Sequence, residues 1–509
     1  MKVLSKCTFL ILTVAITLQS CVKDLDIAPI ANNSASAFYS SEIEVNQAAI
    51  GIYARLGRNG TNTDFPTEYF YLASENRADI LYIAGETSAQ NDQLDLRKYL
   101  ITPNSGTVNS IFLRMYQIIK EANNLLYFTK EGEYMRYRAE ASFLRAYAYS
   151  ELVRSFGPVA LTTAPIESAD AIALPRASIA EIYTQIISDL EYASANLADV
   201  YTLAQSGRVG SLAAKALLGQ VYMTMAGYPS NDATANAKAE AIYASIITGV
   251  EARFSPTYAG LFTLANENKY DLFSVQFASN AAGLGSSLPG YITSSSSSGT
   301  PFPDWAFSTY SQQGQDLRVD SVLVKEMRAN KDLRLAGSID TAYNTYAKTA
   351  KGADTTIVVK KSIITKFLEK DKTNSKILFW NDYPRNFPII RDADVILLYA
   401  EALIKDSKAS QAKQYVDKIR VRAGLPALTA NPTMDDIKRE RKLEFIGEGR
   451  RYFDLVRWGE AEAVGTLKAF TVRYHSKLNG LAPAVKDLLL PIPQAEMNNR
   501  SNWDQNLGY

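Results

Sequence analysis

The sequence has very little cysteine and histidine. Its 509 residues include two cysteines, Cys7 and Cys21, and one histidine, His475. A single imidazole excludes zinc or iron sites that are built from several histidines, and it argues against a Ser-His-Asp triad. Both cysteines lie within the first 21 residues. The rest of the chain therefore has no thiolate for a metal site, a disulfide or a cysteine nucleophile. We expect no metal, no cofactor and no catalytic residue in this protein.

The sequence also has almost no net charge. Lys and Arg total 54 and Asp and Glu total 53, which gives a formal charge of +1. Nucleic-acid surfaces need clustered positive charge, so the balance predicts that the protein has no nucleic-acid partner. Hydrophobic residues make up 47% of the chain, which is ordinary for a folded protein with a large core.

The N-terminus has the pattern of a bacterial lipoprotein signal. Lys2 and Lys6 precede an apolar run over residues 8–18, too short to span a bilayer. Ser20 next to Cys21 suits a lipoprotein signal peptidase, and the Cys21 thiol would be acylated and become the first residue of the mature chain. We predict a signal peptide over residues 1–20 and a lipidated cysteine with a tether over residues 21–40, which would anchor the chain to a membrane. The alternative is an ordinary secretory signal with an incidental cysteine.

Apolar spacing predicts a mainly helical fold. A capping box over residues 178–181 starts a helix whose apolar stripe continues to Leu197. Another helix runs from about Tyr134 to Phe156, where Gly157-Pro158 ends it. Further Ala-rich helices are expected in pairs that resemble degenerate tetratricopeptide hairpins, over residues 208–226, 235–249, 392–406 and 409–423.

Two regions break the helical pattern, residues 58–109 and 251–390. The second contains a strand-like piece, residues 355–359, and a Gly- and Ser-rich stretch over residues 279–303. Loops that carry aromatic side chains on a helical scaffold are candidate ligand contacts. The chain has 30 tyrosines, which favours a binding function, although many of these rings could simply pack helices together.

Residues 434–458 interleave carboxylates with arginines. Glu440, Glu444 and Glu448 are spaced four apart, as on one face of a helix. A carboxylate pair could perform glycosidase chemistry, in which one acid must stay protonated. The neighbouring arginines favour the ionised form and thus oppose the raised pKa of a general acid. We therefore interpret the segment as structural salt bridges.

Four stretches resemble the SusD/RagB lipoproteins of Bacteroidota. The most specific is EFIGEGRRYFDLVRW at residues 444–458, which is similar to the family motif E-x-x-x-E-G-x-R-x-x-D-L-x-R-W. The others are EASFLRAYAY at 140–149, PIIRDADVILLYAEA at 388–402, and a tail from PIP at 491–493 to QNLGY at 505–509. Leu507 stands where the family usually has proline.

The resemblance implies one SusD-like domain over residues 41–509, mainly α, in which tetratricopeptide-like hairpins support an irregular ligand lobe with a few short strands. The scaffold is expected at about 110–250 and 392–458, and the lobe at about 58–109 and 251–390. Members are non-enzymatic nutrient-binding lipoproteins of the outer membrane, exposed at the cell surface. Each acts as a lid on a SusC-like TonB-dependent transporter. By position in the lobe, the predicted ligand contacts are Arg77, Asp79, Tyr82, Asn91, Tyr291, Trp305 and Tyr310.

The ligand class stays open at this point. An aromatic platform with polar neighbours suits oligosaccharides, whereas a deep polar cleft suits an extended peptide. A secreted glycoside hydrolase and a scaffold without any small ligand are further alternatives.

Overall fold

The computed structural model describes residues 38–58, 63–83, 92–199, 205–279, 283–292, 317–348, 354–368, 381–474 and 482–509. The predicted signal peptide and Cys21 lie outside these ranges. Helices dominate the described chain and its strands are short, which confirms the predicted fold class. Within the described residues, no helix combines the length and the apolar character that crossing a bilayer requires.

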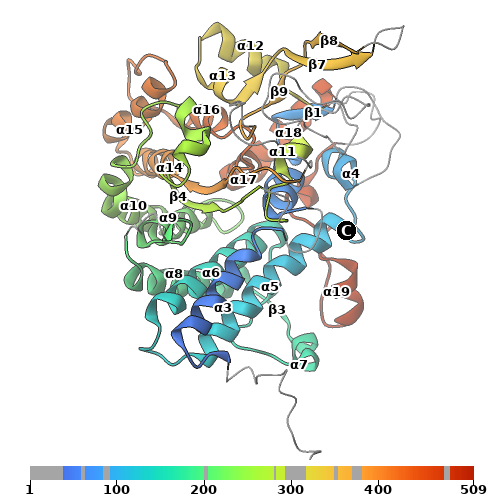
Figure 1. Ribbon diagram of the computed structural model, residues 1–509, viewed down its shortest axis with the longest axis vertical. Coiled ribbons are helices and arrows are strands. Elements are labelled where there is room, and N and C mark those ends of the chain that lie inside the picture. The colour runs from blue at the N-terminus through green and yellow to red at the C-terminus, as the bar shows by residue number, and fades with distance from the viewer. Residues whose placement is uncertain are drawn as a thin grey trace, which may run out of the picture.

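Successive helices pack side by side into one curved layer (Figure 1). They are α3 (Glu42–Ala54), α5 (Gly106–Phe128), α6 (Met135–Phe156), α8 (Ile179–Asn196), α9 (Ser211–Met225), α10 (Ala235–Glu251), α14 (Asp392–Lys405), α15 (Ala409–Arg422) and α16 (Met434–Glu444). The expected helical segments are thereby confirmed as paired, antiparallel neighbours. Although the chain between them is long, α10 packs directly on α14.

Local sequence explains why these helices form. In α8, the Ser178 side chain accepts from the backbone N–H of Glu181, whose carboxylate accepts from the backbone N–H of Ser178. This capping box satisfies donors that the helix leaves free. The stripe that follows is fully buried against α6 and α9, and it comprises Ile182, Ile186, Leu190 and Ala193.

Gly219 sets the distance between α9 and α10. A Cβ at this position would lie 2.5 Å from the ring of Tyr243, which is buried on α10. We predict that Gly219→Ala destabilises the protein by about 1–3 kcal/mol, an overpacking cost that outweighs the better helix propensity of alanine. Gly51→Ala in α3 is the matched control, because a Cβ added there would meet no atom within 4 Å. Urea unfolding should show a lower free energy of unfolding than wild type for Gly219→Ala and a higher one for Gly51→Ala. Equal stability of the two variants would contradict the packing argument.

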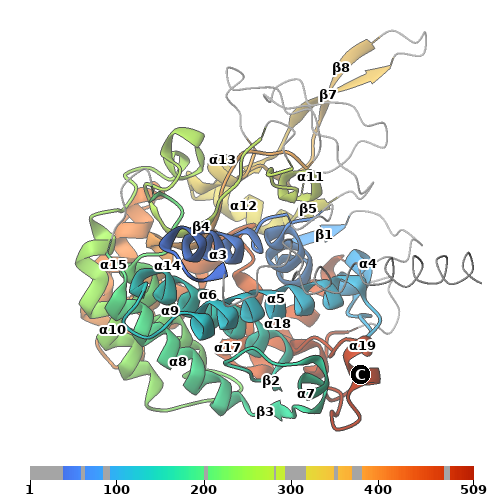
Figure 2. The same cartoon turned by 60° about the horizontal axis from the view of Figure 1, so that its bottom comes forward.

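The chain between α10 and α14 forms most of the second region. It leaves the helical layer along β4 (Asp271–Val275) and returns along β10 (Phe387–Arg391), which pairs antiparallel with β4 and runs directly into α14. Between them lie α11 (Leu288–Ile292), β5 (Leu317–Val319), α12 (Ser321–Ala329), α13 (Arg334–Ser338), β6 (Ile339–Asp340), β7 (Tyr343–Lys348), β8 (Asp354–Val359) and β9 (Ile363–Ile364). The predicted strand at 355–359 is the core of β8. Figure 2 shows that β7 and β8 project away from the body of the molecule.

The first region differs from the expected loop. Its centre is a π-helical segment, η1 (Pro66–Ser74), in which every residue is buried. Asp64 holds its start, because Asp64 Oδ1 accepts from the backbone N–H of Thr67 at 2.8 Å. Stacked aromatic rings such as Phe65 and Tyr69, with centroids 5.1 Å apart, fill the core. The region continues with η2 (Glu75–Arg77), β1 (Leu81–Ile83) and α4 (Asp92–Lys98).

The C-terminal segments close the structure around the helical layer. They comprise α17 (Arg451–Trp458), α18 (Glu460–Tyr474), η6 (Val485–Leu488) and α19 (Gln494–Asn499). Two hydrogen bonds fix the tail to the end of α6. The backbone N–H of Leu490 donates to the carbonyl of Ser155 at 2.7 Å, and Asn506 Nδ2 donates to the carbonyl of Phe156 at 2.9 Å. Segments far apart in sequence therefore meet beside α6.

Candidate functional site

The carboxylates of the 434–458 segment form a buried ion-pair network. Glu448 accepts from Lys366 and Arg391, each at 2.8 Å, and all three side chains are buried. Burial alone raises the pKa of Glu448, but Arg391 and Lys366 more than offset it, so the pKa lies below its usual value. The pKa of Glu444 is lowered in the same way, by Arg422, Arg391 and Arg334 acting against burial.

A second group of ion pairs joins α14, α16 and α17. Arg457 donates to both oxygens of Glu401, at 2.6 and 2.7 Å, and Arg441 bridges Asp394 and Asp454 at 2.8 Å each. Burial raises the pKa of Glu401, yet Arg457 outweighs it and lowers that pKa to about 2. Ionised carboxylates cannot act as general acids, so these contacts support the structural interpretation of the segment.

The pKa of Glu75 is raised, in contrast to those of Glu401, Glu444 and Glu448. Glu75 is buried, and burial raises its pKa to about 7 despite hydrogen bonds from the backbone N–H groups of Gly447 and Gly449 and the nearby charge of Lys366. Because the folded pKa exceeds the unfolded value of 4.5, the folded state binds more protons between pH 4.5 and 7. The contribution of Glu75 to stability is therefore largest below pH 4.5 and falls as the pH rises towards 7.

We predict that Glu75→Gln removes this pH dependence. Wild type should lose up to about 3 kcal/mol of unfolding free energy between pH 4.5 and 7 from this group, at 1.36 kcal/mol per pKa unit. Urea unfolding at several pH values measures the slope for wild type and for the variant. Exposed Glu131→Gln is the control, which should retain the wild-type slope. If Glu75→Gln also keeps that slope, Glu75 titrates normally.

Two predicted ligand residues, Arg77 and Asp79, are engaged by protein groups. Arg77 is 3% exposed, and its guanidinium lies 4.1 Å from the ring centroid of Tyr452 and donates to the Asp487 carbonyl. Asp79 is 5% exposed and accepts from Arg451 and Lys442, at 2.7 Å each. Burial raises the pKa of Asp79, but these two cations outweigh it and hold the pKa well below its usual value. These contacts tie the start of β1 to α16 and α17.

The remaining predicted residues fall into two groups. Tyr291 is buried on α11 within the main core. Asn91, Trp305 and Tyr310 lie outside the described residues, so their assignment as ligand contacts stays a prediction.

Tyr82 is the predicted residue that combines an aromatic ring with partial exposure. It stands between buried Leu81 and Ile83, so the alternation of β1 turns Tyr82 away from the core. Its ring stacks on that of Tyr474, with centroids 4.0 Å apart and planes at 14°. Tyr474 is the last residue of α18 and is also half-buried. Sequence reasoning missed Tyr474, because nothing local links residues so far apart.

Polar groups surround this pair, which we call the tyrosine platform. The Tyr474 hydroxyl donates to Asp320 and accepts from the backbone N–H of Ser321 at 3.0 Å. Arg473, whose side chain is half exposed, pairs with Asp320 at 3.3 Å. β5 holds this side in place, since its strand pairs antiparallel with β1. The platform is thus two stacked rings with exposed polar neighbours, and hydrogen bonds of its hydroxyl hold the Tyr474 ring in place.

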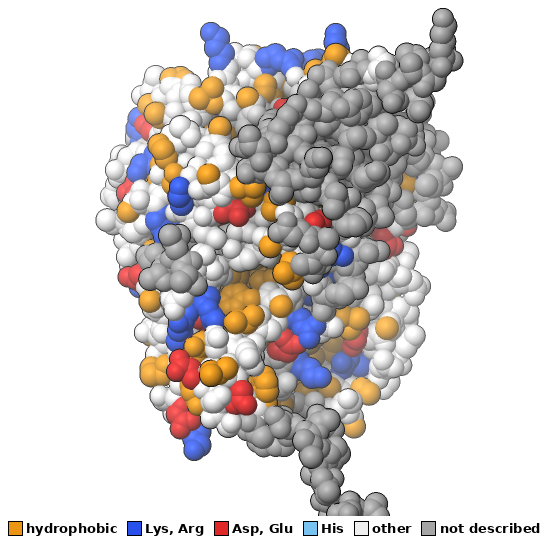
Figure 3. Space-filling view, viewed as in Figure 1, with side chains coloured by type: hydrophobic (Ala, Val, Ile, Leu, Met, Phe, Trp, Pro, Cys, Tyr) orange, Lys and Arg blue, Asp and Glu red, His pale blue; other side chains and the backbone are white. Residues whose placement is uncertain are grey.

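The visible surface has no concentration of positive charge. Figure 3 shows Lys and Arg side chains interspersed with Asp and Glu side chains on the described part of that face. The arrangement agrees with the near-zero net charge of the whole chain.

Comparison with known proteins identifies the family. A model described as "SusD family" matches residues 302–509, and one described as "Starch-binding associating with outer membrane" matches residues 25–223. SusD-like protein P2 of Formosa agariphila is 27% identical over 99% of each chain. The starch-binding protein SusD of Bacteroides thetaiotaomicron is 25% identical over 96% of each.

The fold agrees with this sequence similarity. A solved structure described as a laminarin-binding SusD-like protein superposes with a TM-score of 0.70 at 25% identity, covering 92% of this chain and 100% of that one. The two family models lie in opposite halves of the chain, and the relatives span nearly all of it. The chain therefore belongs to the SusD/RagB family of non-enzymatic, outer-membrane-associated glycan-binding proteins.

Proposed function

We propose that this protein captures oligosaccharides on the tyrosine platform and delivers them to a SusC-like TonB-dependent transporter, for which it serves as the lid. The observation that carries the proposal is the stacking of Tyr82, on β1 of the expected ligand lobe, on Tyr474 at the end of α18. The name of one relative includes starch binding and that of another includes laminarin binding, which supports a glucan as ligand here.

The chemistry of the platform suits a sugar. A pyranose ring presents a flat C–H face that packs on an aromatic ring, while hydroxyl groups need fixed donors and acceptors. Exposed Arg473 and Ser321 lie beside the two rings and supply such groups. In this proposal Asn91, Trp305 and Tyr310 extend the site. Asn91 follows β1 in the sequence and Trp305 and Tyr310 precede β5, and these two strands pair at Ile83 and Leu317 beside the platform.

The location follows from the N-terminus. Acylation of Cys21 would anchor the mature chain to the outer membrane, and the tether over residues 21–40 would leave the lid free to open. Surface exposure is part of this proposal, because a lid must face the substrate and not the periplasm.

The test is calorimetric titration of the mature chain with laminarin, xyloglucan and starch oligosaccharides and with a peptide mixture. We expect saturable heat with at least one glucan and none with the peptides. Saturable heat with the peptides alone would show that the ligand is a peptide and not a glycan. Co-purification of the transporter with the acylated chain tests the lid role separately, and a chain that never co-purifies with a TonB-dependent barrel would contradict that role.

A further inference from the structure

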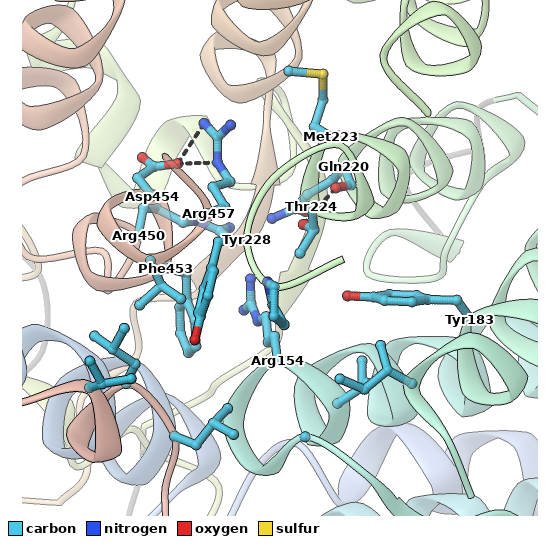
Figure 4. Close-up of a pocket in the computed structure, with 18 of the residues that line it drawn as sticks. Arg154, Tyr183, Gln220, Met223, Thr224, Tyr228, Arg450, Phe453, Asp454 and Arg457 are labelled. Carbon is cyan, nitrogen blue, oxygen red and sulfur yellow. Dashed lines mark hydrogen bonds and ion pairs between the residues drawn. The ribbon is translucent and has the colours of Figure 1, made fainter. Parts of the chain in front are cut away.

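A mostly apolar cavity of about 290 Å³ lies beside α17, and the paired Asp454 and Arg457 belong to its lining (Figure 4). α6, α8, α9, α17, η6 and the C-terminal tail supply most of its walls, and α14 and α16 contribute one residue each. The apolar lining includes Val153, Ile179, Met223, Phe453, Leu488 and Leu489. Its volume is near the lower end of the range for small-molecule sites. The cavity is distinct from the tyrosine platform, with which it shares no residue.

Arg450 is the unusual member of this lining. It is only 4% exposed, its Nε atom has no hydrogen-bond partner, and within the described chain its guanidinium forms no ion pair. Figure 4 shows its side chain extending from the α17 side of the cavity towards the middle. The guanidinium lies 5.4 Å from the ring centroid of Phe70, which offers it a favourable aromatic contact but no hydrogen-bond acceptor.

The other cations of the cavity are already paired. Arg154 pairs with Glu151 and Lys486 with Asp487, whereas Arg441 and Arg457 share Asp454. Asp454 is the carboxylate in the lining, and both of its oxygens are engaged by these two arginines. Burial raises the pKa of Asp394, but the charges of Arg441 and, less strongly, of Arg450 outweigh it and lower that pKa. A buried Nε without a hydrogen-bond partner is costly, so an anion that reached Arg450 would gain a charge-assisted hydrogen bond.

Access is provided at one edge of the cavity. Leu507 is 89% exposed and Val485 is 45% exposed, and both line the cavity. Exposed Pro229 lies on the same rim. The walls offer few polar groups to match the many hydroxyls of a sugar, so an oligosaccharide does not fit this lining.

We propose that the cavity binds a small amphipathic monocarboxylate. Its carboxylate would accept hydrogen bonds from Arg450, and its hydrocarbon body would lie against the apolar walls.

Titration of the mature chain with decanoate tests the proposal. Two matched probes serve as controls: decanol, which lacks the negative charge, and acetate, which lacks the long hydrocarbon body. Decanoate should bind saturably and raise the Tm, whereas the other two probes should bind at least about tenfold more weakly. Arg450→Met should reduce decanoate affinity at least about tenfold while leaving the fold intact, because no ion pair is lost. Arg439→Met, at an exposed pair with Glu326, is the control and should bind as wild type does.

A second variant locates the site independently of Arg450. Thr224 lines the cavity from α9, and Thr224→Met would occupy part of the volume with a residue that favours helix. It should reduce decanoate binding as well. The proposal is overturned if wild type does not bind decanoate, if decanol binds equally well, or if either cavity variant keeps the wild-type affinity.

Discussion

Glu448→Gln is expected to lower the free energy of unfolding by about 3–5 kcal/mol, a large loss for a change that preserves the size of the side chain. Glu448 is fully buried, and its two oxygens accept from Lys366 Nζ, Arg391 Nη2 and Arg391 Nε at 2.8 Å each. A neutral amide removes the carboxylate partner of buried Lys366 and leaves Arg391 with Glu444 as its nearest carboxylate. The NH₂ group of the amide would also face the N–H donors of Lys366 or Arg391, from which the carboxylate oxygen accepts in wild type.

Urea unfolding measures this loss, and a surface ion pair provides the control. Glu326 and Arg439 lie 2.8 Å apart with both side chains about half exposed. Glu326→Gln should cost less than about 1 kcal/mol, because water and salt screen an exposed pair. If Glu448→Gln costs no more than this control, the ion pairs of Glu448 with Arg391 and Lys366 do not stabilise the fold.

Tyr474→Ala is expected to reduce affinity for the best oligosaccharide by about thirtyfold, or ~2 kcal/mol. The variant removes one ring of the tyrosine platform and leaves Tyr82 without its stacking partner. The sugar would then lose both a contact face and the fixed position of the ring that remains. Calorimetric titration with the glucan identified by the panel gives the ratio of dissociation constants directly.

Two further variants separate recognition from folding. Tyr474→Phe keeps the ring but loses the hydroxyl contacts to Asp320 and Ser321, so it should retain most of the affinity. Tyr127→Ala removes an exposed ring on α5, outside the platform, and should bind as wild type does. A Tyr474→Ala protein with unchanged Tm and unchanged affinity would place the ligand elsewhere on the molecule.

Much of the helical layer could be predicted because its causes are local. The Ser178 capping box and the apolar stripe of α8 lie within one segment, and the structure reproduces both. Gly157 ends α6 with a φ of 70°, a conformation that glycine adopts without strain. The structure agrees with the salt-bridge interpretation of the 434–458 segment, but local alternation explains only part of it. Asp454 pairs within the segment, with Arg441 and Arg457. Glu444 pairs with Arg391 and Arg422 from elsewhere in the chain, which the sequence did not indicate.

The candidate site was harder to predict because it depends on contacts between distant segments. Nothing in the sequence around Tyr82 indicates that Tyr474 stacks on it. Arg77 and Asp79 looked like loop residues, yet their side chains reach partners more than 300 residues away, including Lys442 and Asp487. Likewise, the lack of an ion-pair partner at Arg450 becomes visible only when its neighbours' pairs are counted in three dimensions.

The pairing of β4 with β10 has a consequence for how this protein could change over evolution. The strands bring the two ends of a long insertion together where α10 already packs on α14. Chain can therefore be added or replaced between β4 and β10 at a small entropic cost, because loop-closure entropy grows slowly with length. The helical layer would keep its own contacts through such an exchange. A different ligand could thus be accommodated by replacing the segment between β4 and β10 while the helical layer stays the same.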